Sequence, residues 1–192
     1  MARPYQSNTL FKENVLITPY NLNDVVGDTV WLNINIPNKK IFDQTTNTRV
    51  FFDSASFSVI AQVDLLFNNP FIGTGPFASF IFPQGISVNT GNGGAQTYAN
   101  ISFGCSPSTD YNLMVGIVLI EKGVFGISFF NTAIRKCLIN NYENSVLTFA
   151  FDVTDTHKQY YQQLPFSSIG KQIDTNILDR LDKKSMVIIN VQ

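Results

Sequence analysis

The chain has 192 residues, of which 44% are hydrophobic, 13% aromatic and 14% charged. Disordered chains are poor in aromatic residues and rich in charge, so this composition excludes a disordered chain. A typical soluble domain carries about 25% charged residues, far more than this chain. The net charge of −1 argues against a partner recruited by bulk electrostatics, and against sequence-specific nucleic-acid binding, which depends on clustered Lys and Arg.

The first regular element that the sequence predicts is a strand at Val30 to Ile36. Large apolar residues occupy every even position there, with Asn33 and Asn35 between them. This period of two is typical of a strand with one face in water. Pro37 and Asn38 end it. Residues 1–14 are expected to form an N-terminal arm that lies across a neighbouring subunit.

A series of further strands is predicted between residues 49 and 153, from runs rich in β-branched and aromatic side chains. These runs are Arg49 to Phe52, Phe57 to Phe67, Phe77 to Phe82, Thr97 to Phe103, Leu113 to Ile120, Val124 to Phe130 and Val146 to Val153. They follow one another too closely for crossover helices. The sequence therefore predicts a mainly β protein, with an antiparallel β-sandwich or jelly-roll-like domain at residues 15–154.

The C-terminal part, residues 155–192, is predicted to hold a short helical segment and a closing strand packed on the same domain. Thr156 to Leu164 contains no glycine and ends before Pro165, as a short helix does. Thr175 to Lys184 has apolar residues at helical spacing and two lysines at its end, which favour a helix C-terminus. Met186 to Val191 is predicted to be the closing strand.

Charge is distributed unevenly along the chain. Between Ser54 and Ile120 the only charged residues are Asp64 and Asp110, whereas nine of the thirty residues from Asp155 to Lys184 are charged. Protein interfaces are depleted of Lys, Glu and Asp. We therefore expect the β region to be covered by other subunits. The alternative is a neutral sandwich, covered by Asn, Thr and Ser, that stands alone.

No residue set in the sequence predicts catalysis, so we expect a non-enzyme with no catalytic residues. His157 is the only histidine, and Asp152 or Asp155 could orient it. A nucleophile elbow such as GxSxG does not accompany it. A polar residue in the first turn of a helix is the favoured interpretation of His157.

No cofactor or metal residues are predicted either. The cluster Gly91 to Gly94 lacks the lysine of a P-loop and is expected to be a hairpin tip or loop. Asn21, Asn23, Asp24 and Asp28 resemble a calcium loop only in part, because Leu32 stands where a bidentate Glu would sit.

Cys105 and Cys137 lack the spacing and the partners of a zinc site, since His157 is the only further nitrogen ligand. We expect both to be buried thiols. The N-terminus shows no secretory signal, which predicts a protein made and used in a cytosol. The longest apolar run, Leu113 to Ile120, is too short for a membrane span.

Two stretches carry a resemblance: TVWLNINIPN at residues 29–38 and NTGNGGAQTYANISF at residues 89–103. Their composition, poor in charge and rich in Asn and Phe, resembles that of structural virion proteins of tailed bacteriophages, in particular crAss-like phages. The resemblance includes no diagnostic motif, so it assigns no site residue. It implies a capsid auxiliary or decoration protein, or a head-to-tail connector, assembled in the host cytoplasm. The implied partners are copies of itself and other capsid or tail proteins.

A second hypothesis is a carbohydrate-binding or adhesin-type β-sandwich module. It predicts exposed aromatic rings near Trp31 or in the 68–76 loop, because such rings stack on sugars. Trp31 lies in a predicted strand, where a packed aromatic residue is the more common arrangement. A third hypothesis, an enzyme built on His157, requires partners for that residue that the sequence does not supply.

Overall fold

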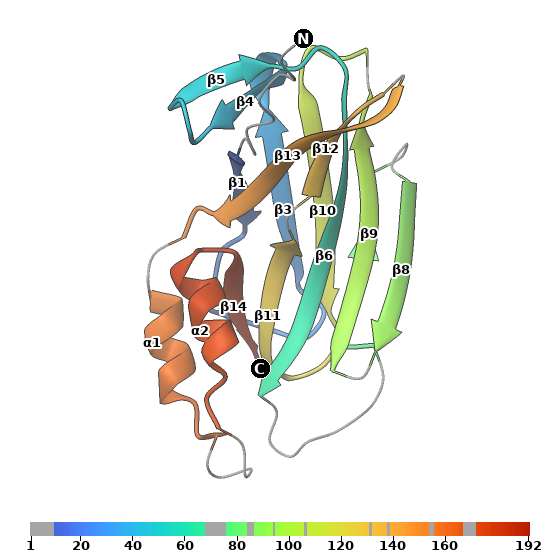
Figure 1. The fold of residues 1–192 in the computed structure, drawn as a ribbon. Helices are drawn as coiled ribbons and strands as arrows, with labels where there is room; N and C mark the ends of the chain where they lie inside the picture. Colours follow the sequence, from blue (N-terminus) through green and yellow to red (C-terminus); the bar gives the residue numbers. More distant parts are fainter. Residues whose placement is uncertain are drawn as a thin grey trace.

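The chain folds as a β-sandwich with two short helices at one end (Figure 1). The computed structural model describes residues 10–67, 76–83, 87–93, 95–105, 107–130, 132–137, 139–153, 156–166 and 172–192. The strands are β1 (Leu10–Thr18), β2 (Asn23–Asp24), β3 (Thr29–Ile36), β4 (Lys40–Asp43), β5 (Thr48–Phe51), β6 (Ala55–Phe67), β7 (Ala78–Ile81), β8 (Ser87–Gly93), β9 (Gln96–Gly104), β10 (Tyr111–Leu119), β11 (Gly123–Phe130), β12 (Thr132–Lys136), β13 (Ile139–Phe151) and β14 (Met186–Val191). The helices are the 3₁₀ turn η1 (Pro37–Lys39), α1 (Thr156–Gln163) and α2 (Thr175–Asp182).

One layer of the sandwich, sheet B, consists of the end of β1 followed by β3, β10 and β7, all antiparallel. The alternation of apolar and polar residues in β3 explains which face of the strand points into the core. Val30, Leu32 and Ile34 are fully buried against the other layer, while Asn33 and Asn35 lie on the outside.

The other layer, sheet A, is centred on the long strand β6. On one side β6 pairs with β9, which pairs with β8. On the other side β6 pairs first with β12 and then with β11. The sheet continues from β11 to β14 and β2, and from β12 through β13 to the start of β1, then β4 and β5.

Strand β1 belongs to both layers. Leu10 to Val15 pairs in parallel with β13 of sheet A, and Leu16 to Thr18 pairs with β3 of sheet B. Residues 10–14, assigned to the arm by the sequence, therefore lie in the sandwich, with Phe11 buried in its core. Residues 1–9 are outside the described part of the chain.

The main core fills the space between the two sheets. Its members include fully buried residues from both layers, such as Phe57 and Val59 of β6, Phe125 of β11 and Ile117 of β10. Burying an aliphatic or aromatic side chain stabilises a fold by about 1.5–3 kcal/mol. The core is therefore the main source of stability.

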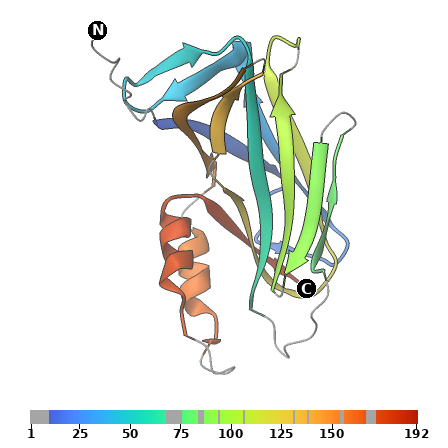
Figure 2. The same ribbon diagram turned by 45° about the vertical axis from the view of Figure 1, so that its right-hand side comes forward.

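A second apolar cluster joins the helices to the outside of sheet A. Tyr161 of α1 and Leu181 of α2 pack on Leu66, Met186 and Ile188 of β6 and β14. Figures 1 and 2 show the two helices side by side against this end of the sheet. Strand β14 is consequently buried on both faces.

The predicted fold class is confirmed: the chain is mainly β, forms a sandwich, and carries short helices near the C-terminus. Two pairings, β1 with β13 and β14 with β2, are parallel, so the sandwich is antiparallel only for the most part. Thr156–Gln163, Thr175–Asp182 and Met186–Val191 match the predicted elements closely. Among the described residues, no helix has the length and apolarity of a membrane span.

Candidate functional site

His157 is a buried residue of the helix–sheet junction. Its side chain is 3% exposed. Its Nδ1 accepts a hydrogen bond from the Ile188 amide at 2.9 Å, and the Tyr20 hydroxyl lies 3.4 Å from the same atom. Burial lowers the pKa of His157 to about 4, so the ring is neutral at physiological pH.

The surroundings of His157 do not form a catalytic set. In the described part of the chain its Nε2 has no hydrogen-bond partner. Asp152 is exposed, and its predicted companion Asp155 lies outside the described residues. A base needs a nucleophile or substrate atom within hydrogen-bond reach. The described contacts of His157 instead attach α1 to β14.

The four residues weighed for calcium lie around β2 and the turn that follows it. Asn23 accepts a hydrogen bond from Asn190 of β14, and Asp28 accepts one from the Val25 amide. Asp24 is buried, which raises the pKa of its carboxyl group. No group of three or more His, Cys, Asp or Glu side chains suited to a metal occurs among the described residues.

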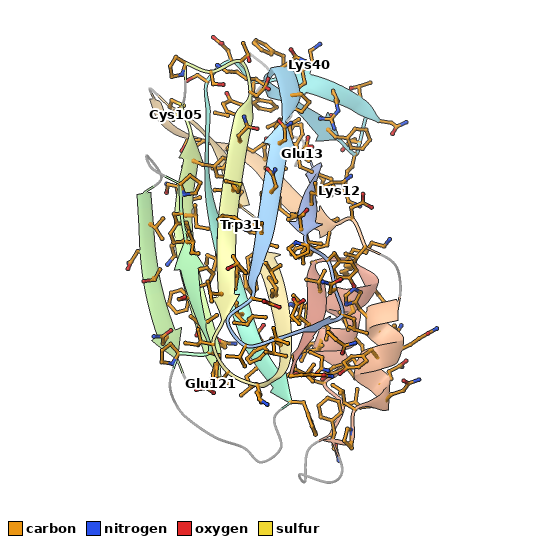
Figure 3. All side chains as sticks on the ribbon, turned by 180° about the vertical axis from the view of Figure 1, so that it is seen from behind. Lys12, Glu13, Trp31, Lys40, Cys105 and Glu121 are labelled. Carbon is orange, nitrogen blue, oxygen red and sulfur yellow. A yellow bond between two sulfur atoms is a disulfide. The ribbon has the colours of Figure 1, made fainter. Side chains whose placement is uncertain are left out.

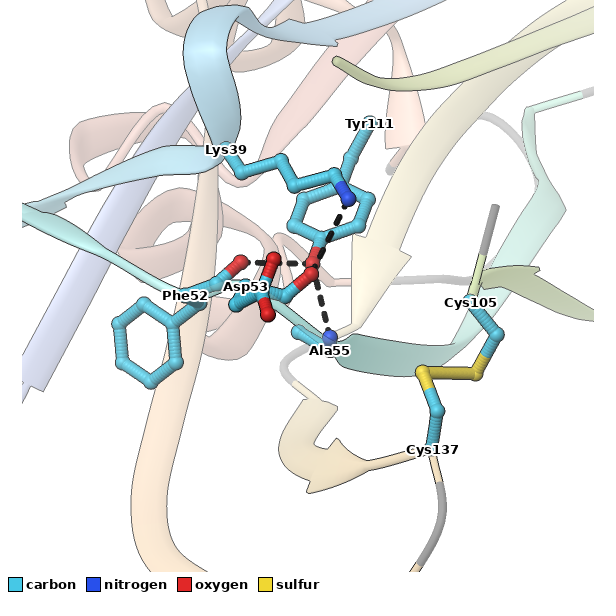
Figure 4. The surroundings of a disulfide bond; sticks show 7 residues. All are labelled: Lys39, Phe52, Asp53, Ala55, Cys105, Tyr111 and Cys137. Carbon is cyan, nitrogen blue, oxygen red and sulfur yellow. Dashed lines mark hydrogen bonds between the residues drawn. A yellow bond between two sulfur atoms is a disulfide. The ribbon is translucent and has the colours of Figure 1, made fainter. Parts of the chain in front are cut away.

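Cys105 and Cys137 form a disulfide, so the prediction of two buried thiols is wrong. The bond joins the end of β9 to the segment after β12, as Figure 4 shows. The two residues are far apart in the sequence, and only the pairing of β9 and β12 with the same strand β6 brings them together. Disulfides persist mainly in oxidising compartments.

The glycine-rich cluster is part of a hairpin, and its strand extends further than expected. Ser87–Gly93 forms β8, and the hairpin turns to β9 after Gly93. A Cβ on Gly91 would lie 2.5 Å from the Tyr98 hydroxyl. A side chain at this position would displace the Tyr98 ring, which lies over Gly91 of the neighbouring strand.

Both charged residues of the neutral region have partners inside the molecule. Asp64 is buried and accepts hydrogen bonds from Gln62 and from Arg180 of α2, the latter at 3.3 Å. Arg180 also bonds Ser128 and covers the Phe130 ring. Asp110 accepts a hydrogen bond from the Asn38 amide at 2.8 Å.

The outer face of sheet B is an uncharged surface, which we call the sheet B face. The strand registers place on it the side chains of Leu16, Thr18, Thr29, Trp31, Asn33, Asn35, Ser79, Ile81, Asn112, Met114 and Val118, with Gly116 among them. Figure 3 shows Trp31 near the middle of this sheet, with Lys40 and Glu121 towards its two ends. The sequence identified the neutral region, but only the registers show which residues share a face.

Apolar side chains form adjoining rows on the sheet B face. Leu16, Asn33 and Met114 are neighbours across three strands, and Leu16 and Met114 are 54% and 42% exposed. In the next row, Trp31, Gly116 and Ile81 are neighbours, and Ile81 is 42% exposed. The half-buried Trp31 ring packs over Gly116, and a Cβ on Gly116 would lie 3.0 Å from the ring.

A separate cleft of about 400 Å³ lies between α2 and the end of β6. Its lining combines Asp64, Gln96, Asn176 and Arg180 with the apolar Ile177. The Asp64 carboxylate is already engaged by Gln62 and Arg180. The cleft therefore offers polar contacts but no general base assembled with a nucleophile.

Comparisons with known proteins give only distant likenesses. No family model matches the chain, and no curated protein matches it. Solved structures that resemble it include several cohesin modules. A non-cellulosomal cohesin from Archaeoglobus fulgidus is 12% identical, with 82% of this chain and 100% of that chain covered and a TM-score of 0.35. The second type II cohesin module of the ScaA scaffoldin of Acetivibrio cellulolyticus is 14% identical, with 74% and 92% covered and a TM-score of 0.40.

A cohesin module from a family 33 glycoside hydrolase of Clostridium perfringens is 9% identical, with 75% of this chain and 99% of that chain covered and a TM-score of 0.36. With TM-scores below 0.5, these likenesses establish neither a family nor a function for this chain.

Proposed function

We propose that this chain is a non-catalytic β-sandwich module that binds other proteins of a larger assembly through the sheet B face. The observation that carries the proposal is the composition of that face. It has no charged side chain, yet Leu16, Ile81 and Met114 are each more than two-fifths exposed.

Interfaces are depleted of charged residues in their centres and enriched in aromatic residues and Met. Contiguous exposed apolar surface marks interaction sites, whereas single exposed apolar residues are ordinary. On the sheet B face Leu16 and Met114 flank Asn33, and the next row holds Trp31, Gly116 and Ile81. Trp31 lies near the middle of the sheet. A partner surface without charge would cover this face at no cost in desolvated ions.

The finer form of the proposal is a structural component of a phage virion, such as a decoration protein or a head-to-tail connector. The resemblance of residues 29–38 and 89–103 to virion proteins supports it. A neutral face also suits a protein that functions while bound in an assembly, because a protein with an exposed neutral surface is less soluble than one with a charged surface.

Co-expression tests the binding role. The chain would be produced together with the products of the genes adjacent to its own. The mixture would be separated by size-exclusion chromatography, and the mass of each eluting species would be measured by light scattering. We expect a complex with one of those products. Because Met114 and Asn33 are cross-strand neighbours on the face, Met114→Lys and Asn33→Lys each place a charge in the interface and should abolish the complex.

The matched control is Gln159→Lys, which adds the same charge on the exposed side of α1. It should leave the complex intact. A chain that elutes alone with every neighbouring product, or a complex that survives both face variants, would contradict the proposal. Detection of the chain in purified particles of the same genome then tests the virion form separately.

A further inference from the structure

Strand β8 forms a long open edge of sheet A. It pairs with β9 along its whole length, from Ser87 to Gly93. In the described part of the chain no strand pairs with its other edge. Figures 1 and 2 show β8 at the margin of the sandwich, beyond β9. An open edge presents backbone N–H and C=O groups that can hydrogen-bond another strand.

Proteins normally protect such edges with lysine or other charges, with proline, or by making the edge strand very short. The β8 edge has none of these protections. Its seven residues include no charged residue and no proline, and there is no charged residue anywhere from Leu65 to Thr109. The Asn89 and Thr90 side chains are exposed, so both are available to a second strand.

The other terminal strands differ from β8 in the expected ways. Strand β5 carries the exposed Arg49, which pairs with Glu13 at 3.0 Å. Strand β2 has two residues and β7 has four. The β8 edge is thus both longer than these edges and free of charge, which distinguishes it as a pairing surface.

We propose that β8 pairs in antiparallel fashion with β8 of a second copy of this chain, about a two-fold axis at its central residue, Thr90. In such an isologous contact Thr90 lies opposite its own counterpart, and the other residues pair symmetrically about it, Ser87 with Gly93. Like charges placed opposite each other destabilise a strand pair. A copy of β8 meets no like charge, whereas two β5 edges would bring Arg49 close to Arg49.

The absence of charge also selects among other occupants. An acidic or basic peptide would find no complementary side chain along Ser87 to Gly93. A second copy of β8 is an uncharged extended strand, so it brings no unpaired charge to this edge. The contact joins two copies of sheet A and leaves the sheet B face open, so it adds self-association to the proposed partner binding and uses a different surface.

Sedimentation velocity over a range of protein concentrations tests this pairing. We expect the wild-type chain to form a dimer that dissociates on dilution, because an edge contact buries less area than a permanent interface. Thr90→Lys and Thr90→Glu each place like charges at the axis and should raise the dissociation constant about fivefold. An equal mixture of the two variants should dimerise at least as well as the wild type.

Two controls separate this contact from the sheet B face. Gln159→Lys and Met114→Lys should both dimerise like the wild type, and unchanged circular dichroism melting shows that each variant is folded. A wild-type chain that stays monomeric at every concentration would overturn the pairing. So would a dimer that Thr90→Lys leaves intact, or one that Met114→Lys abolishes, since the latter would place the contact on the sheet B face.

Discussion

The charge-poor faces of the sandwich and the charged helical segment expose different kinds of polar side chain to solvent. On the sheet B face and on β8, amide side chains such as Asn33, Asn35 and Asn89 are exposed, whereas Asp64 is buried in an ion pair with Arg180. On the helices, Lys158, Asp182 and Lys183 lie at the surface and pair with one another or with Asp179. The difference indicates that the helices face water, while the sandwich has surfaces suited to partners.

The two regions are joined by polar contacts as well as by apolar packing. Arg180 of α2 reaches Asp64 and Ser128 of sheet A. His157 of α1 accepts a hydrogen bond from Ile188 of β14. Lys184, just after α2, donates to the Val153 carbonyl. Removing these contacts one at a time measures how much each contributes to the attachment of the helices to the sandwich.

The largest effect is expected within the sandwich, from the disulfide. Cys105→Ser opens a cross-link between residues 32 apart in the sequence. Loss of the constraint on the unfolded chain should lower the free energy of unfolding by about 4 kcal/mol. Urea unfolding monitored by Trp31 fluorescence measures it. Reductant should lower the stability of the wild type by the same amount as the substitution does, and should leave the stability of Cys105→Ser unchanged. Equal stability of the two proteins without reductant would contradict the cross-link.

Arg180→Ala should cost about 3 kcal/mol, because it leaves the carboxylate of Asp64 buried without its cation. The double variant Arg180→Ala with Asp64→Ala should be more stable than Arg180→Ala alone, since the stranded charge is then gone. Chemical unfolding of the wild type, Arg180→Ala, Asp64→Ala and the double variant completes the double-mutant cycle. Strict additivity of the two single effects would show that the pair does not couple the helices to sheet A.

Acid should weaken the attachment of α1. Because the pKa of folded His157 is about 4, below the ordinary value of 6.5, the fold favours the neutral ring. Its contribution is fully present above pH 6.5 and is lost as the pH falls towards 4, a change of about 3 kcal/mol. His157→Phe should lack this part of the pH dependence. Parallel stability profiles for the two proteins between pH 6.5 and 4 would refute the account.

The smallest effect is expected on the charged surface. The Lys158 ammonium lies 2.7 Å from Asp182, but both side chains are well exposed. Exposed ion pairs contribute less than about 1 kcal/mol. Lys158→Ala should therefore shift the midpoint of urea unfolding only slightly, and 1 M salt should remove the difference. A loss as large as that of Arg180→Ala would contradict the contrast between the two regions.

The elements that the sequence predicts well are those with a strong apolar period. Thr29–Ile36 and Met186–Val191 are found almost as expected, and the helix after Pro165 begins at Thr175 as predicted. The strands β8 and β12 were not predicted, because their residues lack a repeating apolar pattern and are held by pairing with distant strands. Ile139–Phe151 begins seven residues earlier than the predicted Val146, across a polar stretch, for the same reason.

The binding surface is only partly visible in the sequence. That Asp64 and Asp110 are the only charged residues between Ser54 and Ile120 can be counted directly. That Leu16 lies beside Asn33 and Met114, or that Trp31 crosses Gly116, depends on strand order and register. The disulfide was missed because three strands, β10, β11 and β12, separate Cys105 from Cys137 in the sequence, and their proximity depends on the three-dimensional arrangement around β6.

Hydroxyl-radical footprinting tests the role of the neutral face most directly. The free chain and its assembled complex would be oxidised side by side. Met114 and Trp31 should be modified in the free chain and protected in the complex, while Tyr160 of α1 reacts equally in both and the buried Met186 reacts in neither. Equal oxidation of Met114 in the two states, with protection of Tyr160 in the complex, would show that the helices bind the partner instead.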